Sequence, residues 1–126
     1  MNESSIIKAL LKQDEDTRFE KLLLANFVSI SQTICAFLNT EGGQILIGAS
    51  DKVATGIENA DEKILRLRDF LGEAITPSAI ISIWKEFVED TEFIMVETLE
   101  GANKPYVFDG TIYVRQNNKN RRANRG

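Results

Sequence analysis

Apolar side chains recur at helical spacing in three stretches of the chain, and each stretch is flanked by residues that start or stop helices. Each stretch has one apolar stripe, as expected for a helix that packs on one side against a core. The predicted helices and their boundary residues are 5–11 after Asn2 or Ser4, a helix reaching about Leu38 after Asn26 or Ser29, and 62–75 between Asp61 and Pro77.

Other stretches are rich in β-branched and aromatic residues or mix apolar with polar residues, which favours strands. Asp109-Gly110 is a strong signal for a tight turn. Trp84 and Phe87 lie on a predicted strand and are expected in the core, with stacking on nucleic-acid bases as the minority alternative. Helices and strands alternate in the first half, and strands follow one another later, so we predict an α+β fold, a mixed sheet with helices packed on it. The predicted strands are 17–24, 44–48, 54–57 in a hairpin around Asp51-Lys52, 80–88, 92–99 and 111–115.

The stretch 33–48 links a helix to a buried strand through Asn39-Thr40-Glu41 and Gly42-Gly43. Glycine adopts backbone angles that other residues resist, so the pair allows the chain to reverse within a few residues. A further turn places Asp51 just beyond the end of the strand, where loops often carry functional residues.

The chain has 126 residues and 43% hydrophobic content, which suits one domain with a real core. We expect an α+β domain over residues 1–116 and a flexible basic tail over residues 117–126. No apolar run approaches the roughly 20 residues that span a bilayer, and the N-terminus lacks the features of a secretory signal. A cytoplasmic protein with no membrane partner is therefore expected.

The net charge of −4 hides an uneven distribution. From Arg115 onwards there are five basic and no acidic residues, so the preceding 114 residues carry a balance of −9. This contrast suggests phosphate contact by the basic end, although such tails are often only solubilising. The candidate phosphate contacts are Arg115, Lys119, Arg121 and Arg122.

Histidine is absent and Cys35 is the single cysteine, which excludes Ser-His-Asp chemistry, Cys-His chemistry and an ordinary zinc site within this chain. Cys35 is expected to be a small buried thiol. Carboxylate chemistry with hard cations such as Mg²⁺ or Mn²⁺ remains open.

The run 35–43 (CAFLNTEGG), followed by Ile45-Leu46-Ile47-Gly48 and Asp51, resembles the signature of the Schlafen-type AlbA-like domain. The resemblance extends to the acidic segment 15–20 and to 113–115 (YVR), and so covers nearly the whole chain. One departure is that Lys21-Leu22 follow Glu20 where the family commonly has Phe-Lys.

The resemblance implies a nuclease triad of Glu15, Glu20 and Asp51 that would hold Mg²⁺ or Mn²⁺, with Lys21 near the scissile phosphate. Because residues five apart in a strand point to opposite faces, Glu15 must precede the strand if it is to meet Glu20. The same residues could equally be solvated acids. Asn39 and Thr40 are candidates for orienting this site or touching a phosphate, and capping the backbone is their more ordinary role.

Three functional hypotheses follow. The first is a nucleic-acid-binding module for DNA or RNA, in or from a bacterial regulator. The second is a metal-dependent endoribonuclease acting on structured RNA such as transfer RNA, and the third is a protein-interaction domain without a nucleic-acid role. Schlafen cores resemble two related lobes around a basic groove, so we expect this single lobe to form a homodimer.

Overall fold

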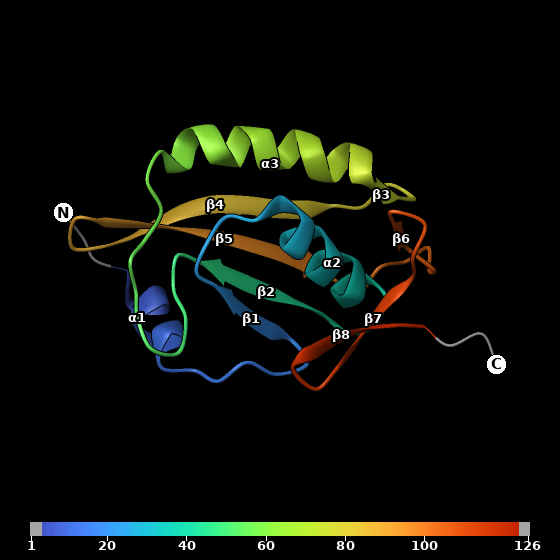
Figure 1. Cartoon of the computed structure of the whole chain (residues 1–126), viewed down its shortest axis with the longest axis horizontal. Coiled ribbons are helices and arrows are strands. Elements are labelled where there is room, and N and C mark those ends of the chain that lie inside the picture. The colour runs from blue at the N-terminus through green and yellow to red at the C-terminus, as the bar shows by residue number, and fades with distance from the viewer. Residues whose placement is uncertain (1–3, 124–126) are drawn as a thin grey trace.

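Within the residues that the structure describes, the predicted apolar stripes and alternating runs fold into three helices and one four-stranded sheet, beside which lie two short strand pairs (Figure 1). The computed structural model describes residues 4–123. The helices are α1 (Ser5–Leu11), α2 (Phe27–Leu38) and α3 (Ala60–Ala74). The strands are β1 (Phe19–Leu22), β2 (Gly42–Ile47), β3 (Ile75–Thr76), β4 (Ile81–Val88), β5 (Thr91–Leu99), β6 (Val107–Phe108), β7 (Tyr113–Gln116) and β8 (Lys119–Arg122).

The main sheet is mixed, as predicted. Its strand order is β1-β2-β5-β4, with β1 parallel to β2 and the other neighbours antiparallel. The parallel pair is joined by α2, since parallel strands need a crossover connection. The short strands form the separate pairs β3-β6 and β7-β8. The predicted α+β class is therefore confirmed.

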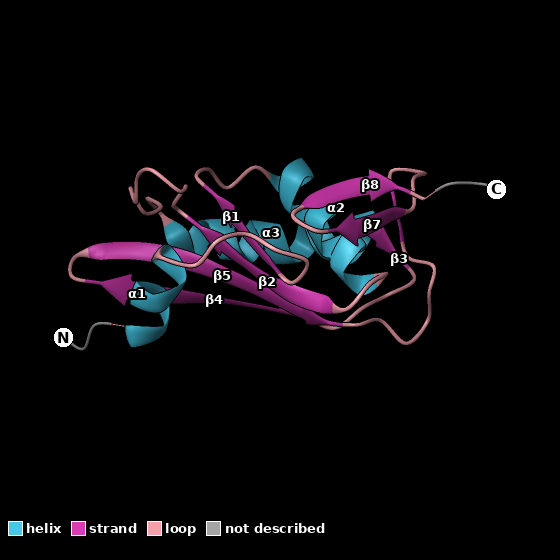
Figure 2. Cartoon of the chain, turned by 90° about the horizontal axis from the view of Figure 1, so that it is seen from below, coloured by secondary structure: helices cyan, strands magenta, loops and turns pink. Residues whose placement is uncertain are grey.

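The two faces of the sheet are covered differently. Helices α2 and α3 pack on one face, and the short α1 lies on the other, near one end (Figure 2). Side chains alternate between faces along a strand, so Phe19 joins the cluster under α1 whereas Leu22 packs with α2 and α3. By the same alternation, Lys21 points to the α1 face and Glu20 to the α2 face. This difference matters for the candidate site.

The helix starts follow capping chemistry. Ser4 and Asn26 accept hydrogen bonds from backbone N–H groups of the first turns of α1 and α2, as predicted among the alternatives. The predicted cap at Asp61 is wrong, because α3 begins at Ala60 after a left-handed Asn59. The helix also ends at Ala74, since Ile75 is extended and pairs with Phe108.

Both glycines of the 42–43 pair are needed, for different reasons. Gly42 has φ of +78°, which suits glycine. At Gly43 a Cβ atom would lie 2.7 Å from the Arg18 carbonyl oxygen and 2.8 Å from the Phe37 ring. Strand β2 therefore starts at the glycines themselves, two residues before the predicted start.

The predicted strand over 54–57 does not form. Only an isolated bridge links Ala49 with Ala54. Instead, the carbonyl oxygen of Gly48 accepts hydrogen bonds from the backbone N–H groups of both Thr55 and Gly56. The segment after Asp51 is therefore bonded to a single residue of the preceding strand end and does not form a ladder of strand hydrogen bonds.

The expected flexible tail is wrong for residues 117–122. Lys119–Arg122 pair antiparallel with Tyr113–Gln116, and Asn117 makes the turn with φ of +55°. Asparagine tolerates this conformation, so the polar sequence can form a hairpin without apolar residues in β8. Residues 124–126 of the expected tail lie outside the described residues. Within residues 4–123, no helix is long and apolar enough to cross a membrane.

Candidate nucleic-acid interface

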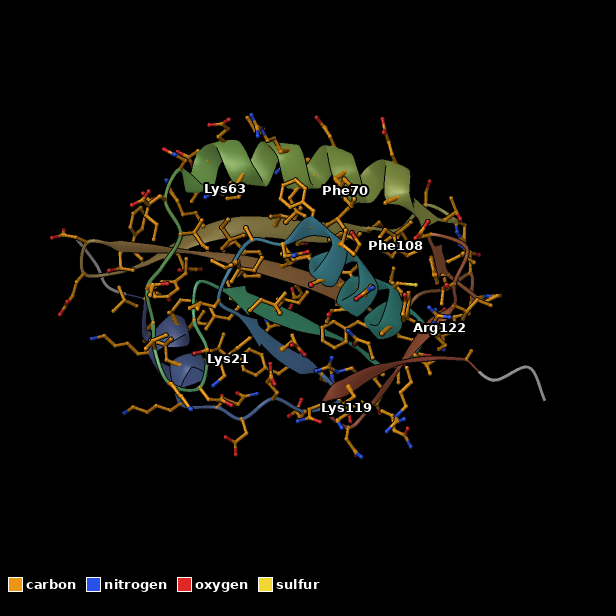
Figure 3. All side chains as sticks on the ribbon, viewed as in Figure 1. Lys21, Lys63, Phe70, Phe108, Lys119 and Arg122 are labelled. Atoms are coloured by element: carbon orange, nitrogen blue, oxygen red, sulfur yellow. The ribbon has the colours of Figure 1, made fainter. Side chains whose placement is uncertain are left out.

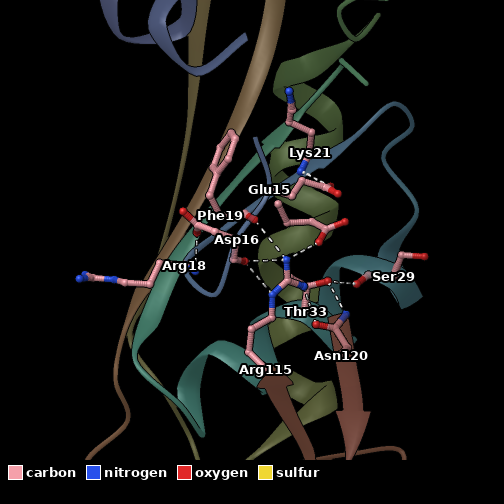
Figure 4. Close-up of polar contacts among 10 residues, drawn as sticks. Glu15, Asp16, Arg18, Phe19, Lys21, Ser29, Thr33, Arg115 and Asn120 are labelled. Carbon is pink, nitrogen blue, oxygen red and sulfur yellow. Dashed lines mark hydrogen bonds and ion pairs between the residues drawn. The ribbon is translucent and has the colours of Figure 1, made fainter. Parts of the chain in front are cut away.

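Arg115 is the anchor of the hairpin and is only 4% exposed (Figure 4). Its guanidinium donates from Nε and Nη2 to the Asp16 carbonyl at 3.2 and 3.1 Å, and from Nη2 to the Phe19 carbonyl at 3.1 Å. Nη2 also pairs with Glu20 Oε1 at 2.7 Å. The plane lies over the Phe37 ring, 5.2 Å from its centroid. Arg115 therefore holds β7 against the start of β1, and its predicted role as a phosphate contact is corrected.

Asn120 is a second anchor that sequence reasoning missed. Its Oδ1 accepts from Arg115 Nη1 at 2.8 Å, and its Nδ2 donates to Thr33 Oγ1 of α2 at 2.9 Å. Asn120 lies in a run of asparagines and basic residues that gives no apolar signal for a strand. The Asn117-Asn118 turn was the available clue.

Glu15 and Glu20 come together, as the spacing argument required. Glu15 precedes β1, and its Oε2 accepts the Lys21 backbone N–H at 2.9 Å. Burial raises the pKa of Glu20 to about 7, because desolvation outweighs the favourable bond from Arg115, and the nearby Glu15 carboxylate acts in the same direction as burial.

Asp51, the third residue of the implied triad, lies apart from Glu15 and Glu20. Its Oδ1 pairs at 2.8 Å with Nζ of Lys21, whose side chain is 3% exposed, while the Asp51 side chain is 67% exposed. Because Lys21 points to the α1 face and Glu20 to the α2 face, β1 separates this pair from the two glutamates. Lys21 is thus neutralised by Asp51, away from Glu20.

The positions of Glu15, Glu20 and Asp51 show whether these side chains could hold the predicted Mg²⁺ or Mn²⁺ ion. A metal-assisted phosphodiester reaction needs carboxylates that converge on the ion. Among residues 4–123, no three His, Cys, Asp or Glu side chains come together to hold a metal ion. Glu20 is instead bound to a buried guanidinium, so the donor set does not fit the implied ion, and we derive no metal-assisted step.

Asn39 and Thr40 bind backbone rather than project outwards. The Asn39 amide donates to the carbonyls of Tyr106 and Tyr113 at 2.9 and 2.8 Å and accepts the Tyr106 N–H at 2.7 Å. Thr40 Oγ1 accepts the Arg115 N–H at 2.9 Å. Cys35 is buried, as expected, and burial raises the pKa of its thiol. These residues tie the end of α2 to the last third of the chain.

The remaining predicted phosphate contacts are exposed on β8. Asn120 points inward, so its neighbours Lys119 and Arg121 point outward. Arg122, opposite Tyr113 at the end of β8, shares the face of Asn120 but is exposed. Figure 3 labels Lys119 and Arg122. The two inward anchors fix the backbone that carries these cations. The four predicted phosphate contacts thus divide into one buried anchor, Arg115, and three exposed side chains, those of Lys119, Arg121 and Arg122.

Two solved structures share the fold. The N-terminal domain of a RecG-related protein from Nitrosomonas europaea aligns with a TM-score of 0.69 and 22% identity, covering 86% of this chain and 82% of that chain. A protein from Corynebacterium diphtheriae aligns with a TM-score of 0.66 and 16% identity, covering 93% of this chain and 25% of that chain. This chain thus spans about a quarter of the second protein.

The family model described as Schlafen, AlbA_2 matches residues 7–124, which include the Asn-Thr-Glu-Gly-Gly run, the paired glutamates and the hairpin. The match covers nearly the whole chain and agrees with the resemblance seen in the sequence. The chain belongs to the Schlafen AlbA_2 family.

Proposed function

We propose that this domain binds nucleic acid through the exposed cations of β8, with Lys119 and Arg121 on the outer face of the β7-β8 hairpin and Arg122 at the end of β8 contacting phosphates. The observation that carries the proposal is a set of exposed cations on a hairpin whose inner side is fixed by Arg115 and Asn120. Phosphate contacts by basic side chains supply most sequence-independent affinity. A fixed backbone lowers the ordering cost of making them.

The setting of a fold neighbour supports the same proposal. The Nitrosomonas europaea protein is named as related to RecG, which that name describes as an ATP-dependent DNA helicase. A domain of the same fold in such a protein is consistent with a role beside nucleic acid. The proposal includes that this domain belongs to a transcriptional regulator.

The test is the triple variant Lys119→Gln, Arg121→Gln, Arg122→Gln. Loss of three phosphate contacts is expected to weaken binding of a duplex or single strand at low salt by about 30-fold or more. Fluorescence anisotropy measures the change. Deleting the chain after Val114 is a poorer test, because it also removes the buried Arg115.

The matched control removes three cations from α3, by Lys63→Gln, Arg66→Gln, Arg68→Gln. This variant has the same net charge, and Lys63 lies on a different part of the molecule from Lys119 and Arg122 (Figure 3). Its affinity is expected to stay within about threefold of the unmodified protein, since distant charges are screened. Equal losses in both variants would contradict a localised interface. No binding of DNA or RNA by the unmodified protein at low salt would favour the protein-interaction hypothesis.

The endoribonuclease hypothesis has less support, because Glu15, Glu20 and Asp51 are not brought together. The nucleic-acid-binding proposal needs no catalytic centre. A transfer RNA cleavage assay with Mn²⁺, repeated with Asp51→Ala, distinguishes the two.

Self-association is a further part of the proposal. Ile80 and Leu99, 92% and 79% exposed, lie at adjoining ends of β4 and β5, beside a cavity of about 460 Å³. Exposed apolar patches mark interaction surfaces, and burying these side chains against a second copy favours association. We expect a homodimer at micromolar concentration that Leu99→Glu converts to a monomer, as measured by light scattering. A monomeric unmodified protein would contradict this part, and Leu65→Glu on the outer side of α3 is the control.

A further inference from the structure

The outer face of the hairpin can be specified residue by residue. Arg115 and Asn120 are opposite one another in the register and point inward, and Tyr113 also faces the body, where its hydroxyl accepts a bond from Gln32. Alternation along each strand therefore places four residues on the outer face. They form the cross-strand pairs Gln116 with Lys119 and Val114 with Arg121.

This outer face carries more than positive charge. Gln116 is exposed beside Lys119, and the turn that follows it, Asn117-Asn118, is exposed as well. Phosphate contact needs only cations and simple donors. Primary amides carry a donor and an acceptor side by side, which matches the adenine edge in the major groove, and Arg or Lys matches guanine. Around one turn the hairpin thus presents amide side chains that can read base edges beside cations that can hold phosphates.

The shape of the hairpin favours one class of nucleic acid. Paired strands lie about 4.8 Å apart, so a two-stranded ribbon with its side chains fits the major groove of B-form DNA, about 12 Å wide. The major groove of an A-form RNA helix is too narrow for such entry. The turn lies at the periphery of the molecule (Figure 1), and the inner face is fixed to β1 and α2 by Arg115 and Asn120. These contacts hold the ribbon in a fixed position on the body of the domain.

We infer that the β7-β8 hairpin enters the major groove of double-stranded DNA, where Gln116 and Asn118 read base edges while Lys119 and Arg121 hold the flanking phosphates. This inference rests on the proposed function and narrows it to duplex DNA. It assigns a recognition role to Gln116 and Asn118. Arg122 stays a phosphate contact at the end of β8.

The experiment selects preferred sequences from a random duplex DNA library with the unmodified protein and then measures affinities by anisotropy. The selected duplex is expected to bind at least tenfold more tightly than an unselected duplex and than an RNA duplex of the same sequence. The double variant Gln116→Ala, Asn118→Ala is expected to bind the unselected duplex as before, because its cations remain. It should lose about tenfold or more of the discrimination, as expected for a lost base contact.

Asn103→Ala removes an exposed amide outside the hairpin and should leave the preference intact. Thermal unfolding of all variants checks that each is folded. Equal affinity for the RNA duplex, or a preference that survives the double variant, would overturn this inference while leaving the proposed function standing. Absence of any nucleic-acid binding would instead remove the proposed function, and this inference with it.

Discussion

Replacing Arg115 with methionine is expected to lower the free energy of unfolding by about 3 to 5 kcal/mol, the usual cost of breaking a buried ion pair from one side. The substitution removes the cation that favours ionised Glu20, so the buried carboxyl must either take up a proton or remain as an unpaired charge. It also leaves the carbonyls of Asp16 and Phe19 without the donors that now satisfy them. Urea unfolding monitored by circular dichroism measures the loss.

Arg121→Met is the matched control, because it removes the same side chain from the exposed face of the same hairpin. A change within about 0.5 kcal/mol is expected there. Adding Glu20→Leu to Arg115→Met should recover part of the loss, since the uncompensated carboxylate is then absent. Equal stability of the two arginine variants would show that Arg115 does not anchor the hairpin.

The second large effect concerns the pH dependence of stability at Glu20. Its pKa of about 7 in the folded protein lies above the ordinary 4.5, so the folded state keeps the Glu20 proton to higher pH than the unfolded state does. Stability therefore falls as pH rises from about 4.5 to 7 and stays low above that range. Relative to Glu20→Gln, which does not titrate, the unmodified protein is expected to lose roughly 2 to 3 kcal/mol between pH 4.5 and 8.

Urea unfolding of both proteins across this range gives the difference directly, and the other carboxylates cancel in the comparison. The sequence has no histidine, so no other side chain of ordinary pKa titrates between pH 6 and 8. Parallel stability profiles for the two proteins would show that Glu20 is not held in a desolvated position.

The apolar periodicity was enough to predict the three helices, the mixed sheet and the glycine-mediated entry into β2, because those elements bury continuous stripes of side chains. It could not predict β8, whose sequence Lys-Asn-Arg-Arg has no apolar residue. That strand is held by polar bonds from Arg115 and Asn120 to partners distant in sequence. Such long-range polar contacts leave no periodic signal.

The candidate site was predictable in part for the same reason. The spacing of Glu15 and Glu20 required Glu15 to precede the strand, and the two do meet. The position of Asp51 depends on which face of β1 its partner Lys21 occupies, and residue spacing alone did not settle that. Arg115 looked like one more member of a basic tail, because burial of a charged residue depends on Glu20 and the carbonyl groups that surround it.

The salt dependence of nucleic-acid binding tests the central claim most directly, because it counts phosphate contacts. For a duplex DNA probe, the slope of log affinity against log salt concentration should be shallower for the variant Lys119→Gln, Arg121→Gln, Arg122→Gln by about 2.7, at roughly 0.9 per lost contact. The slope of the α3 control should match that of the unmodified protein. Identical slopes for the hairpin variant and the unmodified protein would contradict binding through the β7-β8 hairpin.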